Sequence, residues 1–98
     1  MNNEEFNNEI KNGRDTFPEL FKLYYKPIFG YIFRRTGNFD DTADIAADTF
    51  LKAFRHFDKF VYKGVPIKAW LYRIATNETN LYYRYRQKNT SLVQRIVF

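Results

Sequence analysis

The sequence predicts an all-α fold, a compact bundle of three main helices in one domain. Apolar residues recur at helical spacing in three segments, which is the pattern of amphipathic helices. Gly37 and Pro66 separate these segments, because such residues commonly end or open a helix, and Arg34 and Arg35 suit a helix C-terminus. Eleven Phe, eight Tyr and one Trp supply the bulky side chains that a core of only 98 residues needs.

The first helix is expected between Thr16 and Gly37. Residues Thr16–Glu19 have the form of a capping box, in which the Thr16 hydroxyl accepts a hydrogen bond from the Glu19 amide. Pro27 lies inside the helical pattern, where a proline ring clashes with the preceding turn. We therefore expect the helix to kink at Pro27 or to split near Tyr24.

The second helix is expected over about residues 41–57, after a short connection, Asn38–Asp41, that supplies its N-cap. Its predicted buried face consists of Ala43, Ala46, Ala47, Phe50, Phe54 and Phe57. Asp58–Val65 has no helical period and contains a glycine, so we expect a loop there.

Pro66 opens the third helix, which we expect to be about twenty residues long. Its predicted core stripe consists of Ile67, Leu71, Ile74, Leu81 and Tyr85. The helical domain is thus expected over residues 16–89. An N-terminal arm or short helix precedes it over residues 1–15, and an apolar tail follows over residues 90–98.

Charged residues are distributed unevenly along the chain. Residues 1–50 carry six Lys or Arg and nine Asp or Glu, whereas residues 51–98 carry ten and two. The halves therefore have net charges of −3 and +8, and the whole chain has +5. This asymmetry favours two partners, a basic surface for the acidic half and nucleic acid for the basic half. Alternatively, the uneven distribution of charge arises by chance on helix faces that are simply exposed to solvent.

The side chains most used in catalysis are scarce. There is no Cys, and His56 is the one histidine, so thiolate metal sites are excluded. Paired carboxylates occur at helix-surface spacing, with no predicted apolar pocket that would make one an acid and the other a base. The chain has no Gly-rich phosphate loop and no nucleophile elbow. We expect a protein that is not an enzyme, with no catalytic residues, no metal and no cofactor.

No apolar run approaches the roughly 18–20 residues that a membrane-spanning helix needs. The N-terminal residues Asn2–Glu5 are polar or acidic, unlike a secretion signal. We therefore expect a soluble, cytoplasmic protein.

The third helix predicts a surface for nucleic acid. At 100° per residue, one polar and basic ridge consists of Ala69, Arg73, Asn77, Asn80, Arg84 and Lys88. Arg and Lys contact phosphates and Asn contacts base edges, while Tyr72 and Tyr83, beside Lys68, could stack on unpaired bases. Alternatively, the tyrosines are half-buried in the core and the basic residues only solubilise the helix.

The expected loop and the second helix carry two further candidate sites. In the loop, Phe60 lies between Lys59 and Lys63, a pattern that suits single-stranded nucleic acid, although Phe60 could instead fill the core. On the second helix, Asp41, Asp44 and Asp48 lie near one outward edge with Leu51 among them. That edge is either a solvated face or an interface for a basic protein partner.

Two motifs resemble a known family. Asp41–Phe60 (DTADIAADTFLKAFRHFDKF) and Ile67–Asn77 (IKAWLYRIATN) resemble, in order and separation, region 2 of bacterial extracytoplasmic-function (ECF) RNA polymerase sigma factors. Tyr24-Tyr25 and Arg34–Asn38 also look like that family. The resemblance covers most of the chain, from about Phe17 to about Lys88.

The resemblance implies a sigma factor domain that binds RNA polymerase core and recognises and melts the −10 promoter element. In the family the acidic helix docks on the coiled coil of the β′ subunit. This implies core-binding roles for Asp44 and Asp48, and also for Asp41 and Leu51. Ala47 stands where the family usually has Gln.

The family binds the non-template strand of the −10 element with the third helix and the loop before it, and captures flipped bases. Together with the patterns above, this gives the DNA-binding candidates Phe60, Lys63, Lys68, Trp70, Arg73, Asn77, Asn80 and Arg84. In the family an anti-sigma factor often covers these surfaces, so it is a third candidate partner. A complete ECF factor also has a helix-turn-helix domain, region 4, and residues 90–98 would begin the linker toward it.

Two other functions stay open at this point. One is a general single-stranded nucleic-acid-binding helical module. The other is a decoy that binds an anti-sigma factor and has no transcription activity.

Overall fold

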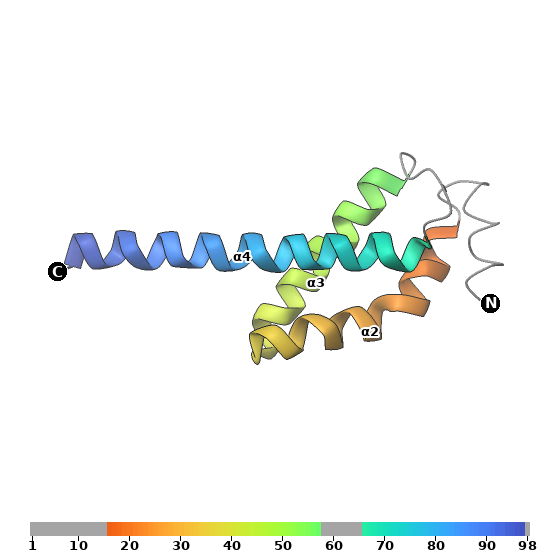
Figure 1. The fold of residues 1–98 in the computed structure, drawn as a ribbon, viewed down its shortest axis with the longest axis horizontal. Coiled ribbons are helices and arrows are strands. Elements are labelled where there is room, and N and C mark those ends of the chain that lie inside the picture. The colour runs from red at the N-terminus through yellow and green to blue at the C-terminus, as the bar shows by residue number, and fades with distance from the viewer. Residues whose placement is uncertain (1–15, 58–65, 98) are drawn as a thin grey trace.

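The computed structural model describes the backbone of residues 16–57 and 66–97, with the side chains up to Lys88 and that of Ile96. These residues form the helices α2 (Phe17–Thr36), α3 (Phe39–His56) and α4 (Ile67–Val97), which confirms the predicted all-α class. α2 and α3 lie against the first part of α4, whose C-terminal part extends beyond them (Figure 1). The expected loop and the optional N-terminal helix lie outside the described residues.

α2 runs through Pro27 without a break, so the predicted split near Tyr24 is wrong. Pro27 has no amide proton, and the carbonyl of Leu23 therefore loses its helical donor. Pro27 and Leu23 are both exposed, so water can take the place of that donor. The helix continues because tertiary packing on its opposite face outweighs one missing hydrogen bond.

Of the two predictions for the ends of α2, one is confirmed and the other is wrong. Gly37 ends the helix as predicted, with φ +63° and its amide donating to the carbonyl of Phe33 at 2.8 Å. The predicted capping box at the other end is wrong, because Thr16 already has helical backbone angles and its side chain makes no capping hydrogen bond. A residue in the helical region cannot direct its hydroxyl back to the Glu19 amide.

The predicted N-cap of α3 is confirmed. Asn38 is extended, and its side-chain oxygen accepts from the amide of Asp41 at 2.9 Å. The hydroxyl of Thr42 donates to the Asn38 carbonyl at 2.7 Å and lies 2.6 Å from the hydroxyl of Thr36. This network joins the end of α2 to the start of α3, which begins at Phe39, two residues earlier than expected.

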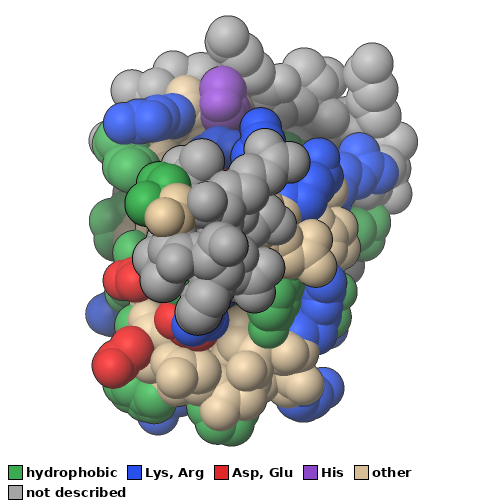
Figure 2. All heavy atoms as spheres, turned by 90° about the vertical axis from the view of Figure 1, so that its left-hand side faces the viewer, with side chains coloured by type: hydrophobic (Ala, Val, Ile, Leu, Met, Phe, Trp, Pro, Cys, Tyr) green, Lys and Arg blue, Asp and Glu red, His purple; other side chains and the backbone are tan. Residues whose placement is uncertain are grey.

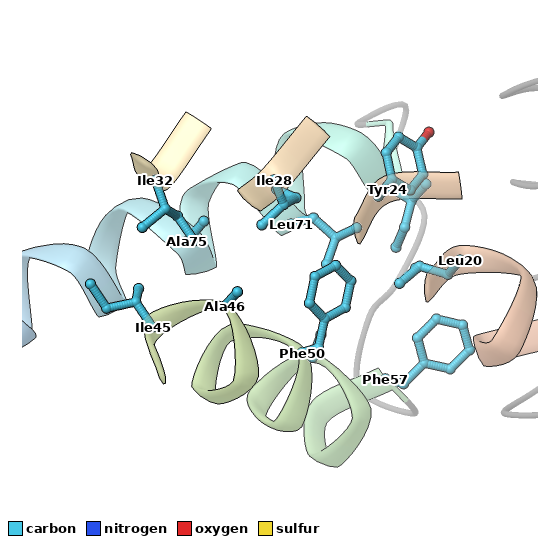
Figure 3. Close-up of a cluster of buried hydrophobic side chains, with 12 residues drawn as sticks. Leu20, Tyr24, Ile28, Ile32, Ile45, Ala46, Phe50, Phe57, Leu71 and Ala75 are labelled. Atoms are coloured by element: carbon cyan, nitrogen blue, oxygen red, sulfur yellow. The ribbon is translucent and has the colours of Figure 1, made fainter. Parts of the chain in front are cut away.

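All three helices contribute to one apolar core (Figure 3). Its buried members are Leu20, Tyr24, Ile28, Ile32, Ile45, Ala46, Phe50, Ala53, Phe57, Ile67, Leu71 and Ala75. Burial raises the pKa of the Tyr24 hydroxyl above its ordinary value, because the charged form would lose its water.

The buried face of α3 is rotated from the predicted one. Ala47 and Phe54 are exposed, whereas Thr42 and Thr49 are fully buried. Threonine is compatible with a core when its hydroxyl has a partner, and the Thr49 hydroxyl donates to the carbonyl of Ile45 at 2.8 Å.

The buried stripe of α4 also differs from the prediction. Leu81 and Tyr85 are 44% and 68% exposed, and Ala75 and Thr79 are buried in their place. The Thr79 hydroxyl donates to the Ala75 carbonyl at 2.7 Å. Small side chains at this junction let α4 approach α2 and α3 at once. α4 is also longer than expected, since it has 31 residues and continues to Val97.

Polar contacts hold α3 to α4 beside this core. The Tyr82 hydroxyl donates to one carboxylate oxygen of Asp41 at 2.5 Å, and the Arg86 guanidinium donates to the other at 2.6 Å. The hydrogen bond to Asp41 raises the pKa of Tyr82, and desolvation adds to this shift, because both favour the protonated phenol. One turn earlier, Lys52 forms an ion pair with Glu78, whose Oε1 has no other partner among the described residues.

Removing the N-cap tests the start of α3. Asn38→Ala is expected to lower the free energy of unfolding by about 1 kcal/mol, because the Asp41 amide loses its acceptor. Urea unfolding followed by circular dichroism measures this change. Asn38→Ser keeps a capping oxygen and should recover most of it, whereas equal losses in the two variants would contradict the capping role.

The hydrogen bond from Tyr82 to Asp41 predicts that the stability of the fold depends on pH. Because the folded-state pKa of Tyr82 is raised, its stabilising contribution is present below the unfolded-state value of about 10 and is lost as pH rises through the folded-state value. Tyr82→Phe should therefore lower the melting temperature at neutral pH, and its difference from the wild type should close at alkaline pH. Tyr85→Phe, at a more exposed tyrosine, is the matched control and should change little at any pH. A difference in melting temperature between Tyr82→Phe and the wild type that stays constant up to pH ~11 would contradict a stabilising hydrogen bond from Tyr82 to Asp41.

Candidate functional site

The outer side of α4 carries a polar ridge, defined here as Arg73, Asn77, Asn80, Arg84 and Lys88. All of these residues are exposed except Asn80, which is half-buried. Leu71, Ala75 and Thr79 are buried on the opposite side of the helix, so packing turns the ridge outward. Basic residues and asparagines on one helix face can contact phosphates and base edges.

α2 contributes to the edge of this ridge. The Arg35 guanidinium donates to the side-chain oxygen of Asn80 at 2.7 Å, and the Tyr83 hydroxyl donates to the backbone carbonyl of Arg35 at 3.0 Å. One turn away, the hydroxyls of Tyr31 and Thr76 are hydrogen-bonded at 2.7 Å. Arg35 is not among the site residues predicted from the sequence, because its charge has a sufficient explanation at the helix C-terminus.

The aromatic residues at the start of α4 serve mainly in packing. Trp70 is half-buried, and its ring centroid lies 6.4 Å from that of Phe57. Tyr72 packs edge-on against Tyr31, with 4.9 Å between ring centroids. Lys68 lies 5.9 Å from the centre of the Tyr72 ring, within range of a cation–π contact. The two loop candidates, Phe60 and Lys63, lie outside the described residues.

The acidic edge of α3 divides into two parts. Asp44 and Asp48 are exposed, and Leu51, about one turn after Asp48, is 48% exposed. Asp41 is different, because its two carboxylate oxygens are held by Tyr82 and Arg86. The outward part of the predicted acidic site is therefore Asp44, Asp48 and Leu51.

Beside this edge, α3 and α4 form a groove of about 480 Å³ that we call the acidic groove. It is lined by Asp44, Ala47, Asp48, Glu78, Leu81, Tyr82 and Tyr85. Leu81 and Tyr85 are not among the predicted site residues, because helical spacing assigns both to the core stripe of α4. Ala47 has nothing beyond Cβ to fill the groove. Two exposed carboxylates beside exposed apolar side chains suit a partner with basic and apolar residues.

The two surfaces occupy different sides of the molecule. Figure 2 views it from the C-terminal end of α4, with acidic side chains gathered on the left and several Lys and Arg side chains along the right-hand edge. Within residues 16–57 and 66–97, no group of three or more His, Asp or Glu could hold a metal ion. In the same part of the chain, no helix has both the length and the apolar character to cross a membrane.

Known proteins share this segment. The family model for sigma-70 region 2 matches residues 20–89. The chain is 38% identical over 71 residues to RNA polymerase sigma factor YlaC of Bacillus subtilis (strain 168), covering 72% of this chain and 40% of that protein. It is 35% identical over 72 residues to ECF RNA polymerase sigma factor SigW of the same organism, covering 72% and 38%.

A third relative is ECF RNA polymerase sigma factor BldN of Streptomyces coelicolor, at 36% identity over 63 residues, 64% of this chain and 24% of that protein. The chain thus spans less than half the length of these curated relatives. The matched residues include all of the polar ridge and all of the acidic groove. The chain belongs to the sigma-70 region 2 family, in the form found in ECF sigma factors.

Proposed function

We propose that this domain binds RNA polymerase core through the acidic groove and the −10 promoter element through the polar ridge, and so acts in transcription initiation. The observation that carries this proposal is that the two surfaces lie on different sides of one helix, α4. Both can therefore be occupied at once, which a factor that brings polymerase to a promoter requires.

The proposed partner of the acidic groove is the coiled coil of the β′ subunit. Asp44 and Asp48 would attract basic side chains and set the orientation of docking. Leu51, Leu81 and Tyr85 are exposed beside them and would contribute apolar binding energy. An anti-sigma factor that covered the same groove would block access of the polymerase.

The proposed ligand of the polar ridge is the non-template strand of the −10 element. Arg73 and Arg84 would contact phosphates, and Asn77 lies between them where it can contact a base edge. Unpairing and unstacking a base costs a few kcal/mol, which these contacts must offset. This function needs binding energy and no catalytic group. The family assignment supports it over a general single-strand-binding module.

Charge reversal in the groove tests polymerase binding. Asp44→Lys and Asp48→Lys should each reduce capture of polymerase core by the immobilised chain at least tenfold, because attraction becomes repulsion across the interface. Glu19→Lys makes the same charge change at an exposed position of α2 and is the matched control. Equal capture by all three variants would contradict docking through the groove.

Salt dependence tests DNA binding. Arg73→Ala should weaken binding of a single-stranded −10 oligonucleotide and reduce the slope of log affinity against log salt by about 0.7, the value for one phosphate contact. Lys26→Ala removes an exposed charge from α2, away from the ridge, and should leave the slope unchanged. Asn77→Ala should keep the slope and relax base preference. An Asn77→Ala variant with unaltered base preference would count against base contact by the ridge.

A further inference from the structure

We propose that Arg35 orients the side-chain amide of Asn80 so that its NH₂ group, rather than its oxygen, faces DNA, which favours keto bases over amino bases. This inference rests on the proposed contact between the polar ridge and single-stranded promoter DNA. It makes Arg35, on α2, a positioning residue for base recognition by α4.

The orientation of the Asn80 amide follows from the chemistry of its neighbour. A guanidinium has five N–H donors and no acceptor. The Arg35 Nη2 atom lies 2.7 Å from the Asn80 side chain, so the amide oxygen must face Arg35. The NH₂ group of Asn80 must then point away from it.

Contacts on both sides of Asn80 hold α2 against α4. One turn before Asn80, the hydroxyl of Thr76 is bonded to that of Tyr31 at 2.7 Å. One turn after it, the Tyr83 hydroxyl donates to the backbone carbonyl of Arg35 at 3.0 Å. The register of α2 against α4 is therefore fixed around Asn80, and hydrogen bonds from a charged donor are about twice as strong as neutral ones.

This arrangement changes which bases Asn80 can accept. A free asparagine recognises adenine with both of its amide groups, by accepting from N6 and donating to N7. With its oxygen turned toward Arg35, Asn80 presents its NH₂ donors to DNA. Thymine and guanine present a keto oxygen at pyrimidine position 4 or purine position 6, whereas cytosine and adenine present an amino group there. At that substituent the Asn80 NH₂ group meets an acceptor on thymine or guanine and a donor on cytosine or adenine.

The test is the affinity of the 98-residue chain for single-stranded −10 oligonucleotides with each base placed in turn at each position. At the position where Asn80→Ala removes base preference, the wild type should prefer keto over amino bases by about 3- to 10-fold, the worth of one hydrogen bond. Arg35→Ala should bring that ratio close to one, because the amide can then rotate and accept.

Two further variants separate positioning from charge and folding. Arg34→Ala removes the same charge from the adjacent exposed residue of α2, whose side chain leaves the helix about 100° away from that of Arg35. This variant should weaken DNA binding without changing the ratio of affinities for keto and amino bases. Asn80→Asp keeps an acceptor facing Arg35 and removes the donors, so the keto preference should disappear with the helices intact. Circular dichroism melting checks the fold of every variant.

The inference is overturned if Arg35→Ala keeps the wild-type ratio, or if the wild type shows no keto preference at any position that depends on Asn80. Those results leave the proposed DNA binding in place, because the oligonucleotide is still bound. A chain that binds no single-stranded DNA contradicts the proposed function itself.

Discussion

The packing of α4 against both α2 and α3 is the constraint on which the rest of the structure depends. Ala75 is fully buried among core residues of all three helices, and its small side chain permits this close approach; Thr79, one turn later on α4, is also fully buried. Because α4 is covered on two sides, only its outer side stays exposed. Arg73 and Asn77 lie on that outer side, so the same packing that forms the core also orients the residues proposed to contact DNA.

Contacts between α3 and α4 also separate the two charged surfaces. Asp41, the acid closest to the basic part of α4, is neutralised by Arg86 and receives the Tyr82 hydroxyl. Asp44 and Asp48, farther along α3, stay exposed beside the groove. One rigid helix, α4, therefore lines the acidic groove on one side and carries the polar ridge on another. A partner bound at one surface is therefore held at a fixed angle to a partner bound at the other surface.

Local signals made the end of α2 and the start of α3 predictable, because Gly37 and Asn38 act on groups within a few residues. Helix faces were harder to predict. Threonine is polar by composition, yet Thr49 and Thr79 are buried because each hydroxyl donates within its own helix. The outward acids and basic ridge followed from helical periodicity. The groove wall and the contact of Arg35 with Asn80 did not, because both join residues tens of positions apart through packing that no local pattern encodes.

Simultaneous occupancy of the two surfaces is the central claim, and a sedimentation experiment tests it most directly. A labelled single-stranded −10 oligonucleotide is mixed with the chain and polymerase core, with core and oligonucleotide alone as the reference. The label should sediment with the complex of chain and core, and it should leave that complex when the chain carries Arg73→Ala and Asn77→Ala together. Release of the oligonucleotide from the chain on addition of core would show competition for one surface and would contradict the claim.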